Sequence, residues 1–205
     1  MKLGLRTEKF ITREELRFYC RKLHLDYLTA IGYLTANDYA VRILRGIFYI
    51  KSIEEKKLKK INLDYMEAIK EALGIKGIEN WYFGLETAVK LNGLTHEYFT
   101  VDYVINDTIS RPIPLEILRH KIKFIKISKN LFNFGIIKKK MPKIPYANIE
   151  KTVLDMVYLA KYRHFSDEEI KNKVLELASY CSKRKIREYA GHYPKTVKKL
   201  LGEIL

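Results

Sequence analysis

Residues 39–50 are Tyr-Ala-Val-Arg-Ile-Leu-Arg-Gly-Ile-Phe-Tyr-Ile, a run rich in β-branched and aromatic residues that is broken once, by Arg45-Gly46. Such residues favour strands, and a glycine supplies the positive φ that a tight hairpin turn requires. The run therefore predicts a β-hairpin that presents Arg42 and Arg45 around its turn.

Two short helices are expected before this hairpin. Thr12 and Glu15 have the spacing of a capping box, which predicts a helix that begins after Thr12 and continues to Leu23. A second helix is expected over Asp26–Ala36. Two short helices followed by a basic hairpin are typical of a winged helix, so we assign residues 1–52 to a winged-helix DNA-binding module.

The second helix is the expected recognition helix, and its two sides are predicted to differ. We expect Leu28, Ile31 and Thr35 to face inward, and the polar side to face the major groove of double-stranded DNA. The hairpin arginines would contact the phosphate backbone. The predicted DNA-binding residues are Thr29, Tyr33, Asn37, Arg42, Arg45 and Lys51.

The remaining chain predicts a second, larger domain, so the expected fold class is α+β. Residues 53–61 are charged and weakly periodic and are predicted to be a linker, and residues 62–205 are the second domain, with a short β-sheet flanked by helices and then an all-helical part. We expect helices that begin near Asn62, Asn80, Asn148, Ser166 and Pro194, and strands over 99–105, 121–127 and 134–138. The alternation of the second strand slips between Phe124 and Ile125, as at a bulge or a sheet edge.

The charge of the chain is uneven. The net charge is +15, and residues 1–60 carry 14 Lys and Arg against 7 Asp and Glu. Residues 61–110 carry 3 against 8, and residues 111–205 carry 22 against 9. Alternating blocks favour a polyanion-binding surface, although Lys- and Ile-rich usage is also typical of a thermophile.

A second basic face is expected within residues 111–143, which hold ten Lys and Arg and one acidic residue, Glu116. This stretch could contact nucleic acid, bind an acidic partner, or be a solvated sheet. Its candidate residues are Lys121, Lys123, Lys126, Lys138, Lys139 and Lys140.

The motifs of common enzymes are absent from the sequence. Cys20 and Cys181 lie far apart, the five histidines are scattered, and the ten glycines form no nucleotide-binding loop. We therefore expect no cofactor, no metal site and no enzymatic activity. No apolar run is long enough to span a membrane or to form a signal peptide, so we expect a cytoplasmic protein.

Two other classes of function stay open. A metal-dependent nuclease of the restriction-endonuclease type is the main alternative, and Asp102, Glu150 and Lys151 are its only candidate residues. A module that binds only proteins is the third class.

Three segments together resemble the AbiEi family, the antitoxin and regulator half of type IV toxin–antitoxin and phage-defence pairs. They are residues 10–16 with the hairpin at 41–49, residues 81–95 with their Gly-Leu-Thr ending, and residues 148–155 with a Glu-basic-Thr-x-Leu-Asp helix start. The three occur in family order. The family's N-terminal module usually has three helices, and here Thr12–Leu23 would correspond to the second and Asp26–Ala36 to the recognition helix.

This resemblance implies a transcriptional regulator that represses its own operon by binding double-stranded DNA. It also implies a protein partner, a nucleotidyltransferase-like toxin.

Overall fold

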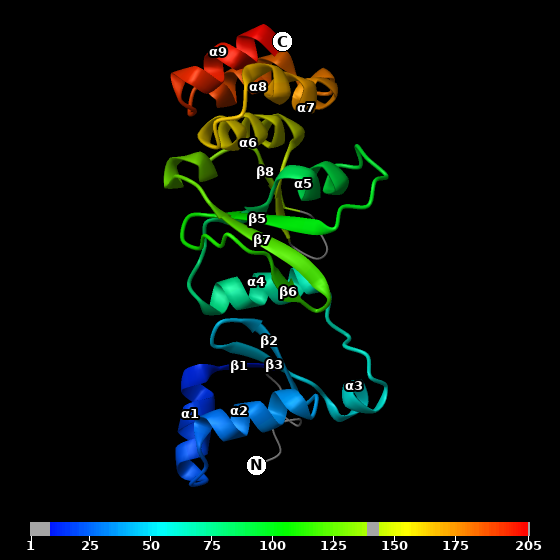
Figure 1. Cartoon of the computed structure of the whole chain (residues 1–205), viewed down its shortest axis with the longest axis vertical. Coiled ribbons are helices and arrows are strands. Elements are labelled where there is room, and N and C mark those ends of the chain that lie inside the picture. Colours follow the sequence, from blue (N-terminus) through cyan, green and yellow to red (C-terminus); the bar gives the residue numbers. More distant parts are fainter. Residues whose placement is uncertain (1–8, 139–143, 205) are drawn as a thin grey trace. The chain divides into compact units, whose positions relative to one another are not determined.

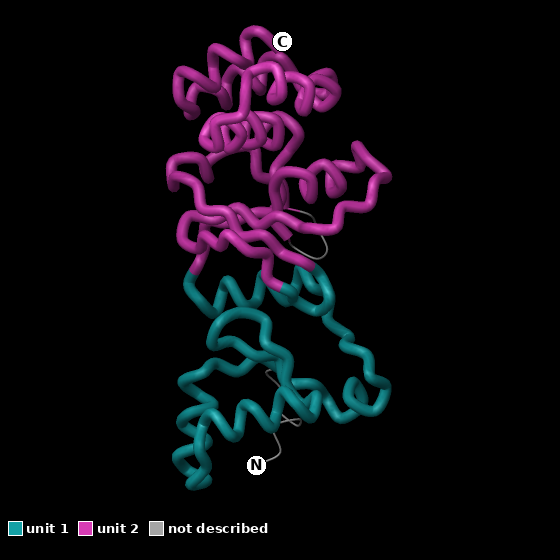
Figure 2. Tube along the Cα trace, in the orientation of Figure 1, with its two compact units in different colours: residues 1–77, 116–120 teal, residues 78–115, 121–205 magenta. Residues whose placement is uncertain are grey.

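The computed structural model describes residues 9–138 and 144–204. The chain folds as two compact units (Figure 2): residues 1–77 with 116–120 form the first, and residues 78–115 with 121–205 form the second. The predicted domain limits at residues 52 and 62 stay a prediction, and the compact units divide the chain at a different place, after Gly77. The fold is α+β, as predicted.

The first unit contains the winged-helix arrangement that the sequence predicts (Figure 1). Its sheet has the order β1-β3-β2 with antiparallel pairing throughout. The elements in chain order are β1 (Phe10–Thr12), α1 (Arg13–Lys22), α2 (Tyr27–Ala36), β2 (Ala40–Leu44) and β3 (Ile47–Ile50). Arg45 and Gly46 make the turn between β2 and β3, and Gly46 has φ of 80°.

Local side-chain caps explain where α1 and α2 begin. The Thr12 hydroxyl accepts from the Glu15 backbone N–H at 3.2 Å, and the Glu15 carboxylate accepts from the Thr12 backbone N–H at 2.8 Å. The Asp26 carboxylate accepts from the Thr29 backbone N–H at 2.8 Å. These caps satisfy N–H groups that have no partner inside the helix.

The predicted inward face of α2 is wrong. Leu28 is 71% exposed and Thr35 is exposed, and only Ile31 of the predicted trio packs toward the core. Four residues at helical spacing instead make the inner side of α2: Tyr27, Ala30, Ile31 and Leu34. They pack against a core that includes Leu16, Cys20 and Phe48. No residue of α2 is fully buried.

The segment predicted to be a linker contains a short helix, α3 (Ile53–Lys57), which begins with a capping box at Ser52. Glu55 of this helix is only 1% exposed. Its carboxylate accepts from the Tyr49 hydroxyl and from the Asn62 backbone N–H, both at 2.8 Å. The Tyr49 hydrogen bond therefore holds α3 against the end of the hairpin. The helix expected near Asn62 is α4 (Tyr65–Ile75), which contacts β2.

The second sheet has six strands in the order β6-β7-β5-β4-β9-β8. The pairs β5–β7 and β4–β9 are parallel, whereas β4–β5 and β8–β9 are antiparallel. The strands are β4 (Trp81–Phe83), β5 (Val101–Asn106), β6 (Leu115–Ile117), β7 (His120–Lys126), β8 (Ile136–Lys138) and β9 (Pro145–Ala147).

Two details of this sheet correct the sequence analysis. The helix expected from Asn80 begins only at Leu85, because Trp81–Phe83 is a strand. β7 is neither bulged nor at an edge: it pairs with β5 in continuous register from Lys121 to Lys126. The alternation of apolar and polar residues breaks between Phe124 and Ile125 because both faces of β7 are covered, so both side chains are buried.

Helices cover one part of this sheet in two layers. Figure 1 shows α6 between the sheet and the last three helices, and α6 contacts α5, α7, α8 and α9. The helices are α5 (Leu85–Leu91), α6 (Ile149–Tyr162), α7 (Asp167–Ser179), α8 (Lys183–Ala190) and α9 (Lys195–Ile204), with a 3-10 turn at Lys129–Phe132. No helix within the described residues is long and apolar enough to cross a bilayer.

Candidate nucleic-acid interface

The residues predicted to read DNA bases are all exposed on α2 or at its end, but two of them donate local hydrogen bonds and the third stacks on a neighbouring ring. The Thr29 hydroxyl donates to Asp26 at 3.0 Å, and the Asn37 side-chain amide donates to the Tyr33 carbonyl oxygen at 2.9 Å. Tyr33 stacks on Tyr39 at 6.1 Å between ring centroids. The side-chain oxygen of Asn37 and the Tyr33 hydroxyl are the polar groups with fewest local contacts.

Arg42 and Arg45 are both exposed. Arg42 is paired with Phe48, a core residue beneath α1 and α2, so it lies on the helix-bearing face of the sheet. Since β2 is an edge strand, that position lets the guanidinium group reach solvent beside the helices. Arg45 lies in the two-residue turn. Both predicted hairpin cations are therefore accessible to a ligand.

Lys51 differs from the other predicted contacts. Its side chain is buried, and its ammonium group forms a 2.5 Å ion pair with Asp38. This pair joins the segment after α2 to the end of β3. A lysine held in this way does not offer its charge to a phosphate, so Lys51 is not included in the proposed DNA contacts.

Two arginines that the sequence analysis missed extend the basic surface. The guanidinium groups of Arg13 and Arg17 lie over the Tyr27 ring, with ring-centroid distances of 5.7 and 5.2 Å. Within the described part of the chain, the buried Nε of Arg13 has no hydrogen-bond partner. The i, i+4 spacing of two arginines on α1 was a visible signal, but their contact with Tyr27 arises only when α1 and α2 pack together.

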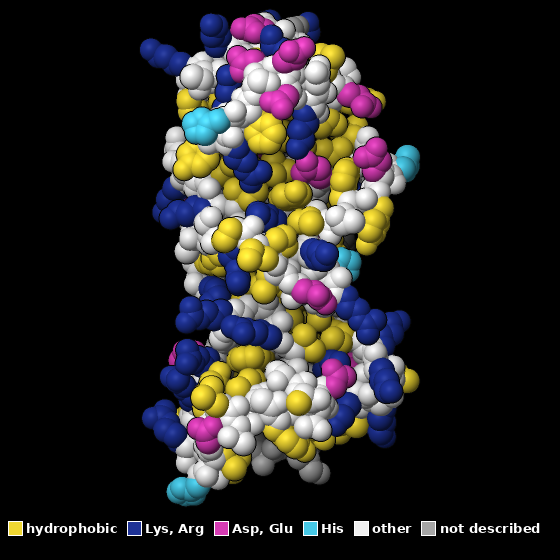
Figure 3. Space-filling view, in the orientation of Figure 1, with side chains coloured by type: hydrophobic (Ala, Val, Ile, Leu, Met, Phe, Trp, Pro, Cys, Tyr) yellow, Lys and Arg dark blue, Asp and Glu magenta, His cyan; other side chains and the backbone are white. Residues whose placement is uncertain are grey.

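The turn of the hairpin lies beside these arginines. The Arg13 backbone N–H donates to the Gly46 carbonyl oxygen at 2.8 Å. Arg13, Arg17, Arg42 and Arg45 are called the arginine group below. Figure 3 shows Lys and Arg side chains gathered over the parts of the molecule that contain α1 and α3, whereas the region of α7 to α9 mixes both signs of charge.

An apolar groove separates α1 from α2. It encloses about 350 Å³, and its walls include Leu16, Leu23 and Leu25 together with Thr29 and Tyr33. The predicted base-reading side of α2 is therefore also one wall of this groove.

The second basic face does not form one surface. Lys121 and Lys123 lie on one face of β7, and Lys126 lies on the opposite face because side chains alternate along a strand. Lys138 is on β8, which three strands separate from β7, or about 19 Å at the usual strand spacing. The Lys123 ammonium group also donates to the Pro112 carbonyl oxygen. Lys139 and Lys140 lie outside the described residues.

The candidate nuclease residues all have local partners. The Asp102 carboxylate accepts from the Thr87 hydroxyl at 3.1 Å, and the Glu150 carboxylate accepts from the Ser182 backbone N–H at 3.2 Å. All three candidates are buried. In residues 9–138 and 144–204, no three His, Cys, Asp or Glu side chains are grouped so that they could hold a metal ion.

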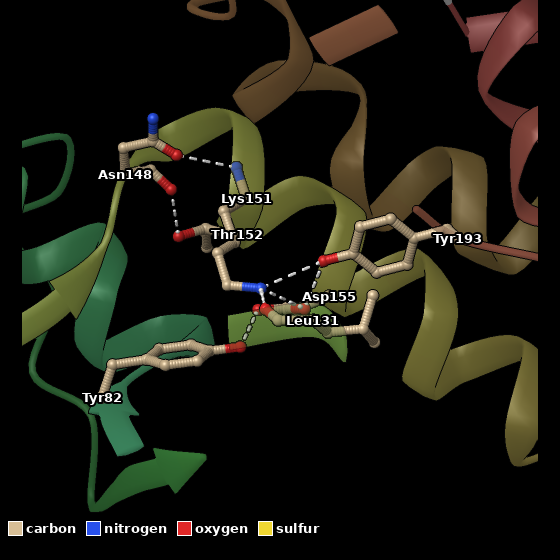
Figure 4. Close-up of polar contacts among 7 residues, drawn as sticks. All are labelled: Tyr82, Leu131, Asn148, Lys151, Thr152, Asp155 and Tyr193. Carbon is tan, nitrogen blue, oxygen red and sulfur yellow. Dashed lines mark hydrogen bonds and ion pairs between the residues drawn. The ribbon is translucent and has the colours of Figure 1, made fainter. Parts of the chain in front are cut away.

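Lys151 belongs to a buried polar cluster at the start of α6 (Figure 4). Its ammonium group donates to the Leu131 carbonyl oxygen at 2.7 Å and lies 3.4 Å from the Asp155 carboxylate. Asp155 also accepts from the Tyr82 hydroxyl at 2.7 Å and from the Tyr193 hydroxyl at 2.6 Å. The cluster therefore joins β4, α6 and the segment before α9.

Burial sets the protonation of this cluster. It lowers the pKa of the Lys151 ammonium group, and the neighbouring Asp155 acts in the opposite direction. It also raises the pKa of the Tyr82 and Tyr193 hydroxyls, an effect that Asp155 reinforces. Both tyrosines therefore stay protonated and donate to Asp155 at neutral pH. The hydrogen bonds of the cluster therefore link the elements from which its residues come.

Comparison with known proteins gives a fold and no function. No family model matches the chain, and no curated protein matches it. The chain is similar in structure to the RV2827C protein from Mycobacterium tuberculosis, with a TM-score of 0.59 and 11% sequence identity. The match covers 99% of this chain and 73% of that one. At this identity the likeness shows the fold alone.

Proposed function

We propose that the chain is a DNA-binding transcriptional regulator that docks on duplex DNA through its winged-helix module. The observation that carries the proposal is the distribution of charge around α2. Residues 27–36 contain no charged side chain, whereas arginines lie on α1, which precedes this helix in the chain, and on the hairpin, which follows it. An uncharged helix whose neighbouring elements carry cations suits base contacts from the helix and phosphate contacts from those neighbours.

The arginine group has the chemistry for the phosphate contacts. A guanidinium group presents its N–H donors in one plane and can bind a phosphate with two of them. Stacking of Arg13 and Arg17 on Tyr27 limits their motion before binding. Fewer rotamers are then lost on binding, which favours affinity.

The base contacts would come from the exposed side of α2. Thr29 and Tyr33 each present a hydroxyl group, and Asn37 keeps its side-chain oxygen as an acceptor. Short polar groups of this kind can contact base edges in the major groove.

Within this proposal we assign the chain the role of an AbiEi-type antitoxin, located in the cytoplasm, that represses its own operon and is not itself an enzyme. The order of its three family-like segments and its α+β fold are consistent with that role. The role requires a nucleotidyltransferase-like toxin as partner. Co-expression with the product of an adjacent open reading frame tests it: growth inhibition by that product should be relieved by this chain.

Selection from random duplexes tests DNA binding itself. We expect one enriched motif, bound about 10³-fold or more tightly than unrelated duplex. A selection that enriches nothing, together with binding that does not weaken as salt is raised, would overturn the proposal.

A further inference from the structure

A second concave site lies within the N-terminal unit, apart from the arginine group. It encloses about 450 Å³ and is lined by residues of β2, of the segments that follow α2, β3 and α3, and of β6 with the turn after it. Val41 lines it, and Val41 lies on the opposite face of the sheet from its neighbour Arg42. The site therefore does not share its surface with the proposed DNA contacts.

The lining is positively charged. Four cations, Lys51, Lys59, Lys60 and Arg119, meet two acidic residues, Asp38 and Glu116. Asp38 is already paired with Lys51. Among the described residues, the side chains of Lys59, Lys60 and Arg119 have no ion-pair partner. Outside the Lys51–Asp38 pair, three cations face one acidic residue, Glu116, and the net positive charge favours an anionic ligand.

The backbone around this cavity is held in conformations that ordinary residues avoid. Seven described non-glycine residues have positive φ, and four of them line the cavity: Asp38 at 59°, Lys59 at 51°, Leu118 at 48° and Arg119 at 69°. Leu118 and Arg119 form the two-residue turn between β6 and β7, where asparagine and glycine are usual. Such strain is typical of ligand-binding sites, where the side chain is needed despite its unfavourable backbone.

Part of the lining is apolar. Val41, Ile61, Leu63 and Leu118 contribute this surface. A bare inorganic anion would leave it uncovered, and a cavity of this volume is within the usual range for small organic ligands.

We propose that this cavity binds a small phosphorylated organic molecule of nucleotide size. Lys59, Lys60 and Arg119 contact its phosphate groups, and the apolar residues contact its uncharged part. This ligand site goes beyond the proposed DNA binding and does not depend on it.

Titration calorimetry with the full chain tests the proposal, with ADP and pyrophosphate as probes at physiological salt. We expect saturable one-site binding of ADP. Arg119→Gly and Lys60→Ala should each weaken it about tenfold or more, because each removes a charged phosphate contact. Adenosine, which lacks phosphate, should bind at least as weakly as either variant binds ADP.

The two variants also separate ligand binding from folding. Glycine accepts the positive φ at position 119 without strain. Arg119→Gly should therefore raise the unfolding temperature of the protein while it weakens ADP binding. Lys198→Ala, which removes an exposed lysine of α9, should bind ADP as the parent does. No saturable binding of ADP or pyrophosphate at millimolar concentration, an equal loss in Lys198→Ala, or equal binding of adenosine would each overturn the proposal.

Discussion

The backbone N–H of Arg13 donates a 2.8 Å hydrogen bond to the carbonyl oxygen of Gly46, so the first turn of α1 is fixed beside the tip of the hairpin. A side chain at Gly46 would place its Cβ 3.5 Å from the Arg13 Cβ. The contact joins a helix and a turn that are 33 positions apart in the sequence. It brings cations from both into one module, which is the basis of the proposed interface.

The exposed side of α2 should determine which DNA sequence is bound. Thr29→Ala and Tyr33→Phe each remove one hydroxyl group and leave the Asp26 cap on the Thr29 backbone N–H intact. If either hydroxyl contacts a base, preference for the selected motif over unrelated duplex should fall by about 1–3 kcal/mol. Fluorescence anisotropy with both duplexes measures this. The salt dependence should hardly change, and Thr35→Ala serves as control because that hydroxyl donates to carbonyl oxygens of its own helix.

Glu55 should make stability depend on pH in the acidic range. Burial alone would raise its pKa, but hydrogen bonds from the Ser52 and Asn62 backbone N–H groups and the Tyr49 hydroxyl, with Lys9 nearby, outweigh burial and lower it to about 2. A carboxylate with a lowered folded-state pKa stabilises the fold above its ordinary value of 4.5. That stabilisation is lost as the pH falls from 4.5 toward 2.

Glu55→Gln tests this account. The variant should be less stable at pH 7 by about 1–3 kcal/mol, because hydrogen bonds to a charged acceptor are replaced by weaker ones. Its stability should also fall less than the parent's between pH 4.5 and 2. Urea unfolding across this pH range gives both quantities, and parallel curves for the two proteins would show that Glu55 is not the titrating group.

The buried cluster around Lys151 should act on stability and not on DNA binding. Lys151→Ala leaves Asp155 buried without its cation, which should cost about 3–5 kcal/mol. Replacing both partners, as Lys151→Met with Asp155→Leu, should cost less than the sum of the single changes. Denaturant unfolding measures the costs. If Lys151→Ala keeps its stability but loses DNA affinity, the cluster has a direct role in binding.

The chain should not cleave DNA. Asp102→Ala and Glu150→Ala should leave any magnesium-dependent cleavage of plasmid DNA by the purified protein unchanged, because both carboxylates have local partners in the fold. Loss of cleavage in both variants, with folding retained, would favour the nuclease alternative.

Elements specified by neighbouring residues were predictable from the sequence. The capping boxes at Thr12 and Ser166, the caps at Asn148, and the hairpin turn at Gly46 each depend on a few adjacent residues, and each is present. The hydrophobic periodicity gave a wrong inward face for α2, where the sequence pattern carries little information. α2 is apolar or weakly polar on every side, so spacing could not identify the face that contains Leu34.

Contacts between distant segments could not be predicted. The strand Trp81–Phe83 looks like part of a helix until its partners in β5 and β9 are known. The lysines of residues 111–143 are close in sequence, but the sheet order separates Lys138 from β7. Arg13 and Arg17 meet Tyr27 only through packing, and the cavity at Arg119 combines segments more than 50 positions apart.

The most direct test of the central claim is a salt titration of DNA binding by two doubly substituted variants with equal charge loss. The first is Arg42→Ala with Arg45→Ala, and the second is Lys121→Ala with Lys126→Ala. If the arginine group contacts the phosphate backbone, the first variant should bind every duplex more weakly and reduce the slope of log K against log salt by about 1.8, while the second keeps the parent's affinity and slope. The opposite result, with the arginine variant unchanged and the lysine variant weakened, would contradict the account.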